Sequence, residues 1–135
     1  YRITTEYRGD DKIYSYVKAK RYFSGPVYKL IHRDIIGKRR YDTNFKNGED
    51  SLFMFLISDS FKNVRFAGID SVYYRRIRSG SALSNVQNRK YMIINQLNLI
   101  KAYTHIYLKN PIKYSLYFFL TRVAASLHFI LTRTL

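Results

Sequence analysis

Two adjacent carboxylates, Glu49 and Asp50, are the side chains of this sequence that are best placed to do chemistry. They follow the turn-forming pair Asn47-Gly48 and precede an apolar run that starts at Leu52. A carboxylate at the start of a helix projects from the edge of a loop, where it can reach a substrate hydroxyl and take its proton as a general base. Acids in a first turn also stabilise a helix through its dipole, so the pair alone leaves a purely structural role open.

The residue types of the sequence give little support to other catalytic or metal-binding chemistry. The chain has no cysteine, which excludes disulfides and cysteine-ligated zinc or iron–sulfur sites. Its histidines, His32, His105 and His128, are too scattered along the sequence to predict a metal site. The sequence contains neither an Asp-x-Asp element nor a glycine-rich phosphate loop. We therefore predict no metal site within this sequence.

Two further motifs flank the acidic pair. Upstream, residues 27–36 contain Lys29 among several aliphatic residues and end in Ile35-Ile36. Downstream, a tyrosine-rich segment that begins at Val72 runs into several arginines and a Ser-Gly-Ser loop. In this order, the three motifs resemble the C-terminal half of the catalytic domain of family 2 glycosyltransferases. The resemblance covers residues 13–84.

That resemblance implies a GT-A fold, which is an α/β fold with a mixed sheet and flanking helices, and this chain would hold part of it. It implies transfer of a sugar from a nucleotide-sugar donor to a hydroxyl of a glycan or lipid-linked acceptor, in surface polysaccharide or glycan assembly. Matched position by position, Asp50 is then the catalytic base and Glu49 binds the acceptor. Arg76, Arg78 and Ser81 then lie near the donor phosphates.

The same residues suit this reaction on physical grounds. Displacement at a sugar carbon needs a base on the attacking side, the role given to Asp50, and positive charge near the leaving diphosphate, which Arg76 and Arg78 can supply. Members of the family bind the nucleotide, and a divalent Mg²⁺ or Mn²⁺ through an Asp-x-Asp element, in an N-terminal half. The resemblance therefore implies that the metal ligands lie outside this chain, and that the chain is the downstream part of a longer protein and is inactive alone.

Charge is distributed unevenly along the 135 residues, whose formal net charge is +15. The last acidic residue is Asp70, and residues 71–135 contain Lys and Arg but no acid. A segment of one sign attracts anions such as nucleic acid, anionic lipid headgroups or a phosphorylated substrate. A basic nucleic-acid-binding module, or a membrane-surface module without catalysis, is therefore the alternative to the enzyme. We expect no nucleic-acid partner, because the aromatic residues mostly occupy apolar-periodic positions, as in a packed core.

Elements on both sides of the acidic pair must position it. The sequence predicts strands over residues 12–17, 64–66 and 71–77, and a short strand that runs into a helical turn over residues 27–36. Residues 37–40 are predicted to form an exposed loop. A helix begins with Glu49, where the helix dipole favours acids. Together these elements make residues 1–84 the acceptor-side half of the predicted domain.

Residues 85–135 are predicted to form a basic helical tail. A helical pattern covers residues 85–110, and Pro111 interrupts it and suits the first turn of a second helix. This second helix is amphipathic rather than membrane-spanning, because only eight positions separate Lys113 from Arg122. It can pack on the domain or lie in a membrane interface. We expect a cytoplasmic protein with peripheral attachment to the inner face of the cell membrane, where lipid-linked acceptors would be found.

Overall fold

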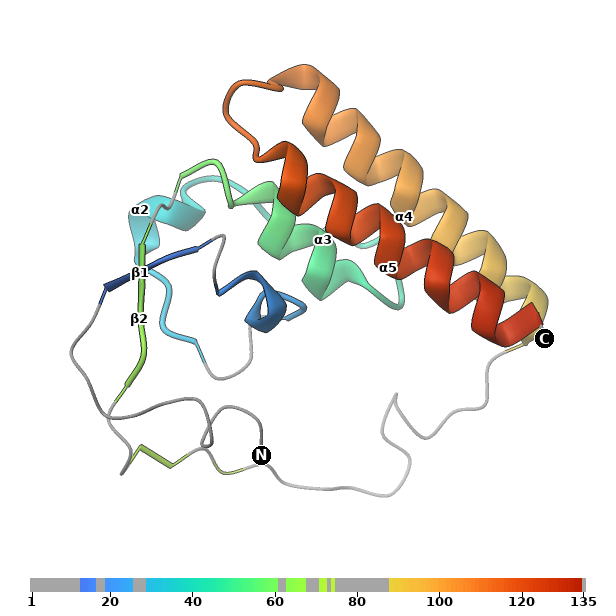
Figure 1. The fold of residues 1–135 in the computed structure, drawn as a ribbon, viewed down its shortest axis with the longest axis horizontal. Helices are drawn as coiled ribbons and strands as arrows, with labels where there is room; N and C mark the ends of the chain where they lie inside the picture. The colour runs from blue at the N-terminus through green and yellow to red at the C-terminus, as the bar shows by residue number, and fades with distance from the viewer. Residues whose placement is uncertain are drawn as a thin grey trace.

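The computed structural model describes residues 13–16, 19–25, 29–60, 63–67, 71–72, 74 and 88–134. Over these residues the chain is a helix-rich structure with one small antiparallel sheet (Figure 1). Its elements, in chain order, are strand β1 (Ile13–Ser15), the 3-10 turn η1 (Lys20–Tyr22), helices α2 (Arg33–Ile36) and α3 (Glu49–Leu56), strand β2 (Asn63–Arg65), and helices α4 (Arg89–Lys109) and α5 (Leu116–Thr134). The expected combination of helices and strands is present, whereas the mixed sheet of a GT-A fold stays a prediction.

The sheet consists of β1 and β2, which pair with Tyr14 opposite Val64. Both strands overlap the ranges predicted for them. The Tyr14 ring meets the Phe66 ring edge-on, with the centroids 5.3 Å apart, and this aromatic contact stabilises a pair of very short strands.

Two other predicted strands are wrong where the structure describes them. Residues 29–32 form no strand before α2, and residues 71, 72 and 74 lie outside any strand. The physical reason is that Leu30 and Val72 are exposed, so neither segment buries an apolar face against a neighbouring strand. The other residues of these two predicted strands lie outside the described part of the chain.

Helix α3 forms the centre of the molecule and begins where the sequence predicts it, at Glu49. Its first turn holds both acids, and Gly48 before it adopts a left-handed backbone conformation with φ of 85°. The buried side chains are Leu52, Phe53, Met54 and Phe55. Because four successive side chains are buried, α3 is packed on most of its circumference, and only its first turn offers polar groups.

Helices α4 and α5 form a long antiparallel hairpin that lies against α3 (Figure 1). The prediction of two helices in this region is confirmed. The prediction that Pro111 occupies the first turn of the second helix is wrong, because Pro111 lies in the connecting turn. The second helix begins later, at Leu116, since the hydroxyl oxygen of Ser115 accepts a hydrogen bond from the backbone N–H of Phe118 at 3.3 Å.

One cluster of buried side chains joins the hairpin to the rest of the chain. Phe55 of α3 is fully buried and packs against the rings of Tyr103, Tyr114 and Phe118. The Tyr114 hydroxyl also donates a hydrogen bond to the backbone oxygen of Leu56 at 3.1 Å. One face of each tail helix therefore packs on the same core as α3, and these aromatic residues fill that core.

Candidate active site

The turn before α3 is held by α4, and this contact positions the acidic pair. Asn95 of α4, which is buried, donates a hydrogen bond to the backbone oxygen of Asn47 at 2.9 Å. Leu99, one turn further along α4, lies so close that a Cβ added to Gly48 would be 2.5 Å from its Cδ1 atom. Position 48 thus favours glycine for two reasons: its backbone is left-handed, and α4 approaches too closely to leave room for a side chain. The start of α3, and with it Asp50, is set by a helix about fifty residues further along the sequence.

Asp50 is half-buried and faces the segment that precedes α2. Its Oδ2 atom lies 3.6 Å from the point where a Cβ on Gly25 would be. The ammonium of Lys29 donates a hydrogen bond to the backbone oxygen of Gly25 at 2.6 Å, so it lies on the same side. Burial lowers the pKa of Lys29, and the negative charge of Asp50 opposes that shift. Asp50 and Lys29 therefore form an electrostatically coupled pair at the edge of the core.

Tyr41 is the second side chain on which the charges of the acidic pair act. Its ring stacks on that of Phe53, with centroids 4.2 Å apart and an angle of 20° between the planes. Burial raises the pKa of the Tyr41 phenol, and the charges of Asp50 and Glu49 raise it further. Phe53 follows Asp50 by three positions on α3, so both lie on the same side of that helix.

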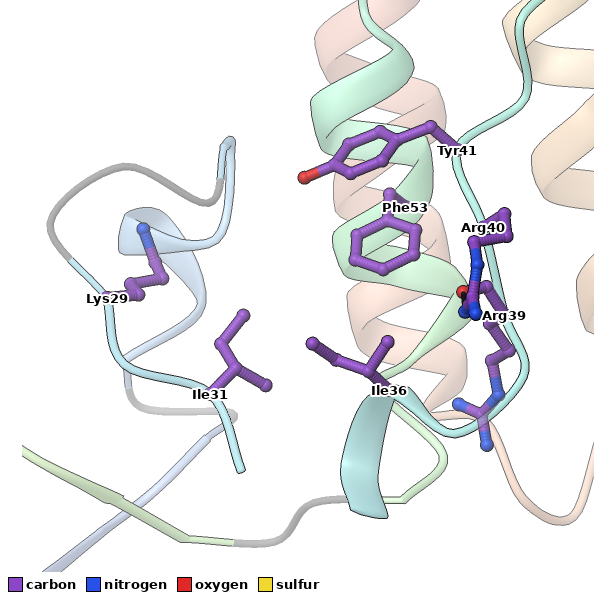
Figure 2. A pocket seen from close by; sticks show the side chains of 7 residues that line it. All are labelled: Lys29, Ile31, Ile36, Arg39, Arg40, Tyr41 and Phe53. Atoms are coloured by element: carbon purple, nitrogen blue, oxygen red, sulfur yellow. Dashed lines mark hydrogen bonds between the residues drawn. The ribbon is translucent and has the colours of Figure 1, made fainter. Parts of the chain in front are cut away.

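Lys29, Tyr41 and Phe53 lie around a cavity of about 300 Å³, which neither Asp50 nor Glu49 lines. Its lining residues are Lys29, Ile31, Ile36, Arg39, Arg40, Tyr41 and Phe53. Figure 2 shows Lys29 and Ile31 on one side of the cavity and the stacked rings of Tyr41 and Phe53 on the other, with Ile36 at one end. Apolar walls with a few convergent polar groups are typical of small-molecule sites, and this volume is at the small end of their range.

The loop that carries Tyr41 is anchored by Arg39. The sequence predicts an exposed loop over residues 37–40, but Arg39 is half-buried and donates hydrogen bonds to the backbone oxygen of Leu56 at 3.1 Å and to the Asp59 carboxylate. The prediction is wrong at this position because a guanidinium can satisfy several acceptors at once, here at the end of α3. This anchor ties the 39–41 segment to the helix that bears Asp50.

A buried polar cluster adjoins Asp50 on the side of the hairpin. The Tyr103 hydroxyl donates to the hydroxyl oxygen of Ser51 at 2.9 Å, and Arg122 donates to the same oxygen at 3.3 Å. Burial raises the pKa of Tyr103 and lowers that of Arg122. Among the described residues, the Nε atom of Arg122 has no hydrogen-bond partner. The cluster links α3, α4 and α5 behind the first turn of α3.

Of the predicted site residues, Asp50 and Glu49 do not line the cavity themselves, but both lie close enough to Tyr41, which does, for their charges to raise its pKa. Arg76, Arg78 and Ser81 lie outside the described residues. Lys29, Tyr41 and Phe53 are lining residues that the sequence did not single out for a role in the site.

A second cavity, of about 330 Å³, lies between α4 and the loop before α3. Its lining residues are Asp42, Asn44, Phe45, Tyr91, Ile94, Asn95 and Asn98. Neither member of the acidic pair lines either cavity, but Lys29 and Tyr41, whose pKa values the charge of Asp50 affects, line the first one, so we place the candidate site there. In the described part of the chain, no group of three His, Cys, Asp or Glu side chains could hold a metal ion.

Comparison of the chain with family models, with curated proteins and with solved structures returned no match. The assignment of a role to this site therefore depends on its geometry. A half-buried carboxylate beside a cavity, with a nearby cation and an aromatic wall, can take a proton from a hydroxyl compound of about the size of one sugar ring.

Proposed function

We propose that this chain is the acceptor-side part of a glycosyltransferase of family 2, with a partial GT-A fold, and that Asp50 is its catalytic base. The single observation that supports this most is the position of Asp50: half-buried at the start of α3, coupled to Lys29 and Tyr41, and beside the 300 Å³ cavity that those two residues line.

In the proposed reaction, Asp50 removes the proton from an acceptor hydroxyl as its oxygen attacks the anomeric carbon of the donor sugar. A bond forms between the acceptor oxygen and that carbon, and the bond between the carbon and the donor phosphate breaks. The nucleoside diphosphate leaves with the bonding electrons, and the proton stays on Asp50 until solvent takes it. Attack opposite to the leaving group inverts the configuration of the anomeric carbon.

Different residues of the site would bind different parts of the acceptor. The stacked rings of Tyr41 and Phe53 form one apolar wall of the cavity, which can contact the apolar face of a sugar. Glu49 and Lys29 are close enough to the site to bind neighbouring acceptor hydroxyls through charge-assisted hydrogen bonds. Because the cavity is small, we expect it to take one terminal sugar of a glycan or lipid-linked acceptor.

The donor side of the site is proposed from the sequence alone. Arg76, Arg78 and Ser81 would neutralise and bind the donor diphosphate. The nucleotide, together with the Mg²⁺ or Mn²⁺ expected for the family, would be held by another part of the protein. We therefore assign no metal ligand in this chain and place no step on a metal. As a further part of the proposal, the site works on the cytoplasmic side of the membrane, in polysaccharide or glycan assembly.

The test compares Asp50→Asn with Asp34→Asn in the whole protein to which this chain belongs. Asp34 is a matched control, because it is also the second residue of a helix, α2, but its side chain is exposed, whereas that of Asp50 is half-buried. Transfer is followed by nucleotide release and mass spectrometry with a panel of UDP-, GDP- and dTDP-sugars. Loss of a general base is expected to lower kcat about 100-fold to 10,000-fold, with donor binding unchanged.

Asp34→Asn is expected to retain wild-type activity. If Asp50→Asn transfers sugar at the wild-type rate, Asp50 is not the base and the proposed mechanism is wrong. If no sugar is transferred by the wild-type protein and the chain instead binds single-stranded oligonucleotides in a steeply salt-dependent way, the chain is a nucleic-acid-binding module.

A further inference from the structure

We propose that α5, together with the turn that joins it to α4, docks on the surface of a bilayer that contains anionic phospholipid. This proposal concerns a different surface from the Asp50 site and does not depend on sugar transfer. It follows from the exposed side chains of the hairpin and from their charge.

The outward face of α5 is a line of exposed leucines. Leu116, Leu120, Leu127 and Leu131 have exposed fractions of 53%, 51%, 46% and 61%. Their spacing of four, seven and four residues places them on one side of the helix, over about 22 Å at 1.5 Å per residue. Phe118, on the other side, is fully buried in the core. The helix is thus packed on one face and apolar on the face that meets solvent.

The solvent-exposed positions of α5 that the structure describes include no Lys, Arg, Asp or Glu. They are Leu116, Tyr117, Leu120, Ala124, Ala125, Leu127, His128, Leu131 and Thr132. A helix on the surface of a globular protein normally presents charged residues to water, so a contiguous apolar face of this length marks an interaction surface. The connecting turn extends this surface, because Ile112 is 99% exposed and Leu108 is 68% exposed.

The positive charge of the hairpin indicates an anionic partner. Residues 88–134 contain seven basic residues and no acid; the seven are Arg89, Lys90, Lys101, Lys109, Lys113, Arg122 and Arg133. Lys109 and Lys113 are exposed on either side of Ile112 in the turn. A surface that combines leucines with lysines complements the lipid tails and the anionic headgroups of a bilayer at the same time. A second copy of this chain would instead bring two acid-free hairpins together, where like charges repel.

The mode of attachment is interfacial. No helix in the described part of the chain is both long enough and apolar enough to cross a membrane. A helix with one apolar face lies in the plane of the interface, with that face about 5–10 Å deep in the headgroup region. Because α5 is already folded on the core by its other face, docking needs no rearrangement of the hairpin.

The experiment measures partitioning of the 135-residue chain onto vesicles of phosphatidylcholine alone or mixed with phosphatidylglycerol. The apolar variant is Leu120→Asn with Leu127→Asn, and its matched control is Leu30→Asn with Val72→Asn, two exposed apolar residues outside the hairpin. The charge variant is Lys109→Gln with Lys113→Gln. Its matched control is Lys38→Gln with Lys46→Gln, which are also exposed.

Binding is expected on the anionic vesicles and is expected to weaken as salt is raised. The apolar variant should bind about tenfold or more weakly than wild type, since each leucine is about half exposed before docking. The charge variant should also bind about tenfold or more weakly, and both controls should bind like wild type. All substituted side chains are exposed, so far-ultraviolet circular dichroism should show unchanged helix content.

A depth measurement provides an independent readout, because the chain has no tryptophan. Leu120→Trp should show a blue-shifted emission on anionic vesicles and quenching by brominated lipid, whereas Leu30→Trp should show neither. Equal binding by wild type and the apolar variant would overturn the proposal, and so would equal binding to vesicles without anionic lipid. If the apolar variant turns a dimer into a monomer and wild type ignores vesicles, the partner is a second copy and the membrane proposal is wrong.

Discussion

Gly48→Ala tests how the start of α3, and therefore Asp50, is positioned. Gly48 has φ of 85°, and alanine in the left-handed region costs about 1–2 kcal/mol. The new Cβ would also lie 2.5 Å from Cδ1 of Leu99, which is only 2% exposed and has little room to move. Overpacking of this kind costs about 1–3 kcal/mol. We therefore expect the free energy of unfolding to fall by about 2–5 kcal/mol.

The control repeats Gly48→Ala in a Leu99→Ala background, which separates backbone strain from the clash. Leu99→Ala removes the Cδ1 atom that the added Cβ would approach. The cost of Gly48→Ala in that background is the backbone term alone, partly offset by the lower entropy of the unfolded chain, so we expect a loss of about 1 kcal/mol.

Urea unfolding of the 135-residue chain, followed by circular dichroism, measures both losses. With an m-value of about 1–3 kcal/mol per M, Gly48→Ala should lower the midpoint of the wild-type chain by on the order of 1 M, and that of Leu99→Ala by clearly less. An equal fall in the two backgrounds would refute the reasoning, because it would mean that Leu99 of α4 does not press on the turn before α3. In the whole protein, Gly48→Ala should also lower sugar transfer, since it displaces the acidic pair.

Two further predictions concern the buried polar cluster. Burial raises the pKa of Tyr103, so its contribution to stability is present below the usual value of 10.0 and is lost as the pH rises through the folded-state pKa. Tyr103→Phe should therefore flatten the decline of the unfolding free energy above pH 10.0, as measured by urea unfolding at a series of pH values. Arg122→Met keeps the packing on Phe118 and removes a buried guanidinium with an unpaired Nε. Urea unfolding of this variant should show a free energy of unfolding that is unchanged or higher by up to about 2 kcal/mol. A clear loss of stability would mean that the hydrogen bond from Arg122 to Ser51 outweighs the cost of burying the guanidinium.

The helices were predictable from sequence because their signals are local. The acids in the first turn and the apolar residues at helical spacing mark the start of α3 at Glu49. The pattern after residue 85 predicts both tail helices, although the second begins at Leu116 rather than near Pro111. That boundary depends on Ser115, whose capping hydrogen bond is also local but is one of several that the sequence allows.

The sequence-based predictions that are wrong concern contacts between distant parts of the chain. β-propensity at residues 71–77 suggested a strand, yet strand formation needs a partner, and the described residues of that segment lie exposed outside any sheet. Arg39 was placed in an exposed loop because basic residues usually are exposed, and only the approach of Asp59 and the end of α3 explains its burial.

From the residues alone, one could establish a carboxylate pair at a helix start and a second half of the chain without acids, since residue type and periodicity are properties of adjacent positions. Folding decided that Lys29, Tyr41 and Phe53 meet around Asp50, and that the leucines of α5 point away from the core. Both outcomes depend on how segments far apart in sequence pack, which the spacing within any one segment does not encode.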